Sequence, residues 1–404
     1  MQNSKKLFIF FYFILIIAFF LNLDPNGGAI LDFKTHSNIA KNFANDFNYT
    51  FNNYEKFSTR HSPILYILIS FFYKFEISET LTRLVFFHFA LILPYIFFKC
   101  IEIKYNNFNS FNNFLFSSLI YVSPTFISLS IWPDSRLFGL IFFTLSIFNY
   151  LKFEKEPTLN NAIKCIIFYT LASYLSPNFS LFSIYFLIKF YKQFKFNKEL
   201  ILIIVINFIF SLPAFLYVFS LNDIFFLKSA VPSNNIKLVD YFNIANKVLI
   251  ILSIIFFYLI PFLITSSIKI NNISLRKILI IFFIFAICLI NFDYKYAYTG
   301  GGIFFKISYF IFKNNFFFYF ISLISLIIIV SVFKPKDLNY LLILLIFLAN
   351  PQYTIYHKYY DPFLLIAFIL LFKLDINKIK LFRSKTITIF YIHSLIFLIL
   401  NFLK

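Results

Sequence analysis

Residues 7–23 read LFIFFYFILIIAFFLNL, a run without a charged side chain. A helix needs about 20 apolar residues to cross roughly 30 Å of hydrocarbon, so a run of this length predicts a membrane-spanning helix. Lys5 and Lys6 precede the run, as in a signal peptide, but no small-x-small cleavage motif follows it. We therefore expect a retained first span.

Apolar runs of similar character recur along the whole chain of 404 residues. The composition is 60% hydrophobic and 13% charged, whereas soluble domains are about 45–50% apolar and about 25% charged. So few charges cannot cover a water-facing surface, which excludes a soluble globular protein. Windows of about 19 residues place spans at 7–23, 84–98, 113–130, 136–151, 161–176, 178–190, 199–219, 248–268, 278–292, 316–333, 339–349, 363–372 and 386–403.

These segments predict an all-α fold, a polytopic transmembrane helical bundle of about 11 to 13 spans. Residues 1–404 are expected to form a single membrane-embedded domain, because no linker and no separate soluble segment interrupts the pattern. Two further apolar stretches, 62–75 and 303–312, are shorter than a full crossing requires. We expect them to be interfacial or re-entrant helices.

The net charge of +19 comes from Lys and Arg residues that gather in short loops between the apolar runs. Such clusters lack the continuous basic face of a nucleic-acid binder, so we expect no nucleic-acid partner. By the positive-inside rule, which counts the basic residues of short loops, they favour a cytoplasmic N-terminus. Segments 24–83, 222–247 and 293–313 then lie on the outer face of the membrane, where polar residues are expected to carry function.

The first outer segment, 24–83, concentrates acidic, basic and histidine residues between two apolar runs. Asp32 lies shortly after the first span, and His36 follows it by four residues. A carboxylate near the membrane surface can be reached by a lipid-borne substrate, and ionisable residues close to the bilayer are often functional. A structural reading stays open, in which Asp24 and Asp32 cap the next helix or solvate the loop.

The order of these motifs resembles that of the bacterial GT-C glycosyltransferases. Members of that family open their first outer loop with Asp-Glu followed by Tyr, continue to a Lys/His-Pro-Pro-Leu element, and begin the next span with Arg-Leu. In this chain the corresponding places hold Asp32-Phe33 with His36, then His61-Ser62-Pro63, and then Arg83-Leu84. Phe33 stands where the family has Glu. This chain therefore lacks the second carboxylate that a two-carboxylate metal site at this position would need.

Two later motifs continue the resemblance. The family's second outer loop, where an acid precedes a span, is similar to WPDSR at residues 132–136. The Arg-Tyr-x-x-Pro-like element that ends the family's transmembrane core is similar to YHKYYDP at residues 356–362. Together the motifs cover most of the chain in the family's order.

The resemblance implies a membrane glycosyltransferase that moves a sugar from a polyprenyl-phosphate donor to an envelope glycan, lipid or protein acceptor, with inversion. Asp32 is the expected catalytic base, because a carboxylate can take the acceptor's proton as the glycosidic bond forms. The residues expected to bind substrate are His36, Arg60, His61, Arg83, Asp134, His357 and Lys358. Among these, the cationic side chains are expected to hold the leaving phosphate.

The sequence indicates no cofactor. Cys100, Cys165 and Cys288 are widely separated and form no CxxC motif or other ligand-like spacing. A divalent cation stays open, because Asp32 could act without one or be joined in space by Asp134. The expected partners are the lipid-linked sugar donor, the acceptor and membrane lipids.

Other interpretations stay open for several of these residues and for the function. Arg83 can snorkel at a helix end, His61 and His357 can be interfacial hydrogen-bonding residues, and Asp134 can be a helix N-cap. The alternative functions are an O-antigen-type polysaccharide polymerase and a non-enzymatic flippase or transporter of lipid-linked glycans. The expected location is the bacterial inner (cytoplasmic) membrane, with the active site facing the periplasm or exterior.

Overall fold

The computed structural model describes residues 2–57, 59, 61–105, 110–220, 243–271, 273–295, 300–333, 337–350 and 354–402. Over these residues the chain consists of helices joined by turns and loops, and the only β-type contact is an isolated antiparallel bridge between Ile268 and Ile376. The expectation of an all-α fold is therefore confirmed. The chain divides into two compact units, one comprising Met1–Lys228 with Tyr391–Lys404 and the other comprising Ser229–Phe390.

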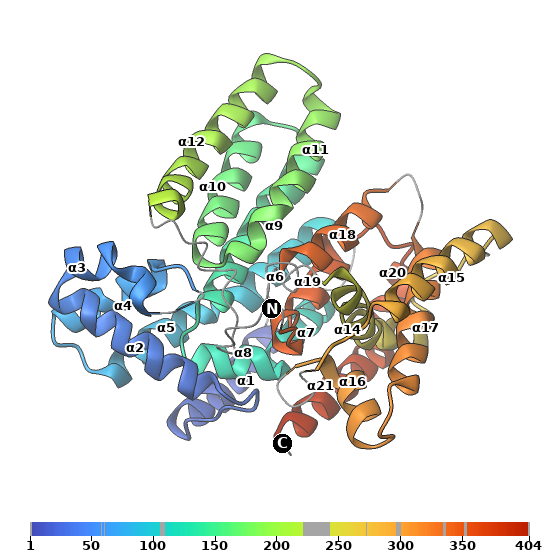
Figure 1. Cartoon of the computed structure of the whole chain (residues 1–404), viewed down its shortest axis with the longest axis horizontal. Coiled ribbons are helices and arrows are strands. Elements are labelled where there is room, and N and C mark those ends of the chain that lie inside the picture. Colours follow the sequence, from blue (N-terminus) through green and yellow to red (C-terminus); the bar gives the residue numbers. More distant parts are fainter. Residues whose placement is uncertain are drawn as a thin grey trace. The chain divides into compact units, whose positions relative to one another are not determined.

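The first unit contains a series of long and short helices (Figure 1). They are α1 (Gln2–Phe20), α2 (Ala29–Asn45), α3 (Phe47–Asn52), η1 (Tyr54–Phe57), α4 (Ile64–Lys74), α5 (Glu79–Ala90), α6 (Ile92–Lys104), α7 (Ser110–Ser117), η2 (Ser118–Val122), α8 (Pro124–Ile131), α9 (Ser135–Lys155), α10 (Leu159–Leu175), η3 (Pro177–Phe182), α11 (Ser183–Phe194) and α12 (Lys198–Ser220). Helix α9 packs against α6 and α10, and α2 packs along α4. The buried helix α9 is therefore the centre of this unit.

The second unit is built around α14, a buried apolar helix that packs against α15, α16 and α17. Its helices are α14 (Ile244–Ile264), α15 (Leu275–Ile290), α16 (Gly302–Phe310), α17 (Phe316–Val332), α18 (Asn339–Ala349), η5 (His357–Tyr359), α19 (Phe363–Leu370) and α20 (Lys378–Leu381). Helix α21 (Ser384–Phe402) begins in this unit and ends in the first.

Among the described residues, five helices are long and apolar enough to cross a membrane, or six if a bent pair is one span. They are Glu79–Lys104, Ser135–Lys155, Lys198–Phe219, Ile244–Ile264 and Ser384–Phe402. The bent pair joins Ser110–Val122 to Pro124–Ile131 at an angle of 68°. These helices give the chain the character of a multi-pass membrane protein.

Every predicted span overlaps a helix. However, the number of described helices that are long and apolar enough to cross a membrane is smaller than the predicted number of about 11 to 13 spans. A hydropathy window does not detect where a helix ends. The predicted span 113–130 is interrupted at Ser123, whose hydroxyl accepts a hydrogen bond from the N–H of Phe126 and caps α8. In the predicted span 363–372, the helix α19 comprises only eight residues, and all eight are buried.

The two stretches predicted to be interfacial or re-entrant also form short helices. The stretch 62–75 contains α4, an apolar helix of 11 residues, and the stretch 303–312 contains most of α16, which has 9 residues. Since a helix rises about 1.5 Å per residue, neither can cross a bilayer alone. This agrees with the expectation from their length.

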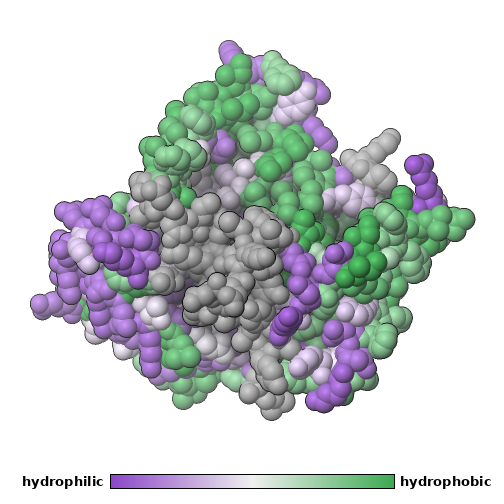
Figure 2. Space-filling model, viewed as in Figure 1, coloured by the Kyte–Doolittle hydropathy of each residue, from purple (hydrophilic) through white to green (hydrophobic). Residues whose placement is uncertain are grey.

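Helix α12 turns most of its apolar surface outward. Only 6% of its most apolar window is buried, compared with 78% for α14. Ile201, Phe208 and Phe215 are each more than half exposed. Figure 2 shows hydrophobic residues over this part of the first unit and hydrophilic residues over α2 and α3. Because exposing apolar area to water costs about 25 cal/mol per Å², the outer face of α12 is suited to lipid.

The turn before α2 is set by Asp24 and two glycines. The Asp24 carboxylate accepts hydrogen bonds from the N–H groups of Gly27, Ala29 and Ile30 at 3.1, 2.8 and 3.3 Å. Gly27 and Gly28 have φ angles of 72° and 87°, a region that side chains with a Cβ rarely adopt. Asp24 therefore caps the next helix. Capping was one of the two structural roles considered for Asp24, the other being solvation of the loop.

Gly139 allows α9 and α10 to approach closely. A Cβ added there would lie 2.7 Å from the Cβ of Ser176 and 3.3 Å from the carbonyl oxygen of Ala172. We expect Gly139→Val to destabilise the first unit by about 1–3 kcal/mol, because overpacking forces the two helices apart. Thermal unfolding in detergent micelles measures the effect, and Phe208→Val on the exposed face of α12 is the control. Equal melting temperatures for Gly139→Val and the wild type would contradict the close approach.

Candidate functional site

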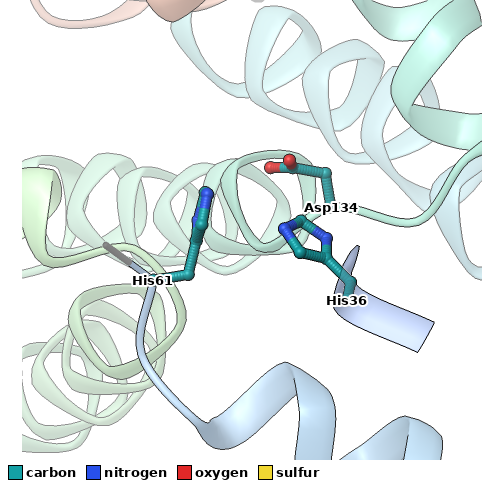
Figure 3. A group of neighbouring side chains, drawn as sticks. All are labelled: His36, His61 and Asp134. Carbon is teal, nitrogen blue, oxygen red and sulfur yellow. The ribbon is translucent and has the colours of Figure 1, made fainter. Parts of the chain in front are cut away.

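Polar side chains from three separate segments of the first unit meet at the start of α9 (Figure 3). His36 comes from α2, His61 from the loop before α4, and Asp134 from the residue before α9. One nitrogen of each histidine and one oxygen of the carboxylate all lie within 4.8 Å of one another. The two imidazole rings meet edge to face, with 4.9 Å between their centroids. We call these three residues the His-Asp cluster.

Helix α2 carries Asp32 and His36 on one side, because residues four apart lie on the same face of an α-helix. Phe33, Ile39 and Phe43 of the same helix are buried, and the helix packs along α4. His36 is 3% exposed, whereas the Asp32 side chain is 40% exposed. One member of the pair therefore lies inside the His-Asp cluster, and the other lies at the edge, where solvent can reach it.

His61 is held through both its backbone and its ring. The Tyr54 hydroxyl donates to the carbonyl oxygen of His61 at 2.7 Å, and the N–H of His61 donates to the Thr59 hydroxyl at 3.2 Å. Nδ1 of the His61 ring lies 2.9 Å from the hydroxyl oxygen of Ser135. The ring is thereby tied to the first turn of α9.

Asp134 is the N-cap of α9 and is 1% exposed. Its Oδ1 accepts hydrogen bonds from the backbone N–H and Nε of Arg136 at 2.8 and 2.7 Å, and its Oδ2 lies 2.6 Å from Nη2 of Arg136. Burial alone would raise the pKa of Asp134, but the charge and hydrogen bonds of Arg136, with His61 and His36, hold that pKa well below its ordinary value. Asp134 is therefore ionised, and it has the capping role that the sequence left open.

Arg136 links the buried carboxylate to the exposed one. Its Nη2 lies 2.6 Å from Asp134 and 3.4 Å from Oδ2 of Asp32. The guanidinium is itself mostly buried, with 14% of its side chain exposed. Asp32 and Asp134 thus lie near each other, as their motifs made possible, and Arg136, a residue not predicted to belong to the site, connects them. The signal was available in the WPDSR motif, where Arg136 follows Asp134 by two residues at a helix start.

His36 has an unusual environment for a histidine. Burial lowers its pKa, although the negative charges of Asp134 and Asp32 oppose this. Within the part of the chain that the structure describes, its Nδ1 is buried and has no hydrogen-bond partner. Since an unsatisfied buried polar atom costs about 1–3 kcal/mol, this nitrogen is a group that requires an explanation.

Arg83 contacts the segment that precedes Asp134, at Ile131 and Trp132. It is 6% exposed. Its Nε donates to the carbonyl oxygen of Ile131 at 3.0 Å, and its Nη2 donates to the side chain of Asn22 at 2.9 Å. The guanidinium also stacks 3.5 Å from the centre of the Trp132 ring. These contacts make Arg83 a positioning residue for the loop before α9, and its predicted contact with a substrate phosphate stays a prediction.

We expect Arg83→Lys to loosen this loop, because an ammonium group cannot reproduce the planar stacking and the fixed geometry of two hydrogen bonds. The expected loss of stability is about 1–3 kcal/mol. Trp132 is the only tryptophan of the chain, so its fluorescence reports on this segment directly. A red-shifted emission is expected for Arg83→Lys, and an unchanged spectrum and melting temperature would count against the positioning role.

Two residues predicted to bind substrate lie in the second unit. His357, in η5, has its ring 5.1 Å from that of Phe257 and 5.7 Å from that of Tyr258. Lys358 lies over the ring of Tyr356 at 5.3 Å. These contacts are with aromatic rings of their own unit, and the role of both residues as phosphate contacts stays a prediction.

Two other predicted regions are only partly described. Arg60 and residues 222–242 lie outside the described residues. In the third outer segment, Oδ1 of Asp293 accepts hydrogen bonds from the side-chain amides of Asn243 and Asn246, each at 2.7 Å. These bonds connect the segment to the start of α14.

Comparison of the chain with protein-family models, with curated proteins and with solved structures gives no match.

Proposed function

We propose that the chain is a membrane glycosyltransferase that moves a sugar from a polyprenyl-phosphate donor to an envelope glycan, lipid or protein acceptor, with inversion. The order of the motifs, which resembles that of the GT-C family, supports this function. Several helices that are long and apolar enough to cross a membrane support its place in a membrane. The proposed orientation has the N-terminus in the cytoplasm and the site at the outer face of a bacterial inner membrane, because the short basic loops favour it.

The observation that carries the proposal is the position of Asp32. It follows the first apolar helix, it is 40% exposed, and its Oδ2 is 3.4 Å from the Arg136 guanidinium. A general base has to be accessible to the acceptor. Asp32 meets this requirement, whereas Asp134 is 1% exposed and does not.

The proposed reaction is a single displacement at the anomeric carbon. The acceptor oxygen forms a bond to that carbon while the bond between the carbon and the phosphate oxygen breaks. The acceptor proton goes to Asp32, and the electron pair of the broken bond leaves with the lipid phosphate. Cationic donors stabilise the departing phosphate most strongly as its charge develops. Arg60 and Arg83 are the proposed donors of the first unit, because they belong to the motifs that resemble those of the family.

The test is a comparison of envelope glycans from cells with and without the gene. Loss of a single sugar residue from a glycan, lipid or protein is the expected result, with accumulation of its polyprenyl-phosphate donor. Two other results would overturn the proposal. Shortened polysaccharide chains would indicate a polymerase, and an accumulated lipid-linked glycan on the cytoplasmic side would indicate a flippase.

A further inference from the structure

We infer that His36, His61 and Asp134 bind a divalent transition-metal ion of the zinc type. The three side chains come from three segments that are far apart in the sequence, and Figure 3 shows them directed towards a common region. The inference concerns binding of an ion and is independent of the transferase reaction proposed above.

The donor set identifies the class of metal. Two imidazole nitrogens and one carboxylate oxygen are ligands typical of zinc and of other divalent transition metals. Magnesium and calcium prefer oxygen ligands and do not suit a site with two histidines. The set also differs from a site built on two neighbouring carboxylates, because Phe33 follows Asp32.

The second observation is the unsatisfied nitrogen of His36. The residue is 3% exposed, and among the described residues its Nδ1 has no hydrogen-bond partner. A neutral imidazole has one N–H and one nitrogen with a free lone pair, so His36 can offer a lone pair to a metal ion.

Charge also favours a cation at this place. With neutral histidines, the two carboxylates of Asp32 and Asp134 and the single guanidinium of Arg136 leave these groups with a net negative charge. Three hydrogen bonds from Arg136 reach the carboxylate of Asp134. Because a carboxylate has about four acceptor positions, one remains for an ion.

The geometry requires a small adjustment. Zinc bonds of about 2.0–2.2 Å place tetrahedral ligand atoms about 3.3–3.6 Å apart, and the three atoms now lie within 4.8 Å of one another. The second side-chain torsion of histidine has a broad energy minimum, so rotation of the rings can supply this movement. Three protein ligands leave the fourth position of a tetrahedron for water or another oxygen.

The experiment uses the full chain purified in detergent, stripped with a chelator and dialysed. Zn²⁺ is added, excess is removed, and bound metal is measured by mass spectrometry. Co²⁺ is then titrated in place of Zn²⁺, because its visible absorption reports tetrahedral coordination. The expected result is one Zn²⁺ per chain, an intense Co²⁺ spectrum, and a higher melting temperature with Zn²⁺ than with Mg²⁺.

His36→Ala and His61→Asn are expected to lose the bound ion and the Co²⁺ spectrum. His88→Ala is the matched control, because the ring of His88 lies in α5 and contacts the Tyr12 hydroxyl at 3.0 Å, away from the cluster. Circular dichroism and gel filtration select variants that retain the wild-type fold. The inference is overturned if the wild type binds no Zn²⁺ or Co²⁺, or if folded His36→Ala and His61→Asn proteins bind them as the wild type does. Neither measurement needs a sugar donor, so failure of the proposed function leaves its outcome unchanged.

Discussion

Asp32→Asn is expected to abolish sugar transfer while leaving the protein folded and in the membrane. The substitution keeps the size of the side chain but removes its ability to accept a proton. Loss of a general base lowers rates by about 10²–10⁴-fold. Because Asp32 is 40% exposed and lies 3.4 Å from the Arg136 guanidinium, the effect on stability should be small.

The measurement is glycan structure in cells that lack the chromosomal gene and carry either the wild type or Asp32→Asn on a plasmid. Immunoblotting of membrane fractions controls for the amount of protein. Asp46→Asn is the matched variant, because Asp46 is another carboxylate of the first outer segment, and asparagine can replace it as the N-cap of α3. Normal glycans in cells with Asp32→Asn would remove Asp32 from the role of base.

Arg136→Gln is expected to destabilise the first unit by about 3–5 kcal/mol, since removing one partner leaves a buried charge uncompensated. The charge concerned is that of Asp134, which is 1% exposed and receives two hydrogen bonds from the guanidinium of Arg136. Its third hydrogen bond, from the backbone N–H of residue 136, is kept in the variant. Asp134→Asn in the same chain should restore much of the stability, because the asparagine still caps α9 and has no charge to compensate.

The effect should depend on pH in a defined direction. In the wild type the pKa of Asp134 is lowered, so its contribution to stability is present above the unfolded pKa of about 3.9 and is lost as the pH falls through the folded pKa. Without Arg136, burial raises the pKa of Asp134 instead, and its ionisation then opposes folding as the pH rises above about 4. The difference in stability between the wild type and Arg136→Gln should therefore be larger at neutral pH than at acidic pH.

The stabilities of the Arg136→Gln and Asp134→Asn variants are measured by chemical or thermal unfolding in detergent. A chelator is present so that no metal ion contributes to the stability. The four chains required are the wild type, each single variant and the double variant. A loss of stability that is the same at acidic and neutral pH, or that Asp134→Asn does not relieve, would contradict a charge-based role for Arg136.

The sequence was informative about the site where a short-range rule applies. Asp32 and His36 are four residues apart, so a helix places them on one face, and the motif WPDSR puts an acid at a helix start. In the structure Asp32 and His36 both lie in α2, and Asp134 is the N-cap of α9, which was one of the interpretations open for it. The approach of α2, the His61 loop and the start of α9 depends on packing between distant segments, which spacing in a single sequence does not reveal.

The predicted spans depended on hydropathy alone, and the predicted role of Arg83 depended on its positive charge at the start of a span. Thirteen apolar windows mark helices, but helix ends depend on caps such as Ser123 and on prolines such as Pro124, which the window averages away. Arg83 is predicted to contact a substrate phosphate because it is a cation at the start of a span. In the structure its guanidinium donates to the carbonyl oxygen of Ile131 and stacks on the ring of Trp132, which the charge alone does not reveal, and the phosphate contact stays a prediction.

The position where α2 begins determines the direction in which Asp32 and His36 point. Asp24 and the left-handed Gly27 and Gly28 define where the helix begins, and every residue added to an α-helix rotates the remainder of that helix by about 100°. One alanine inserted between Gly28 and Asp32 would turn either the carboxylate and His36 away from α9, or the buried side of α2 away from α4. The stretch from Gly28 to Asp32 should therefore tolerate insertions and deletions poorly.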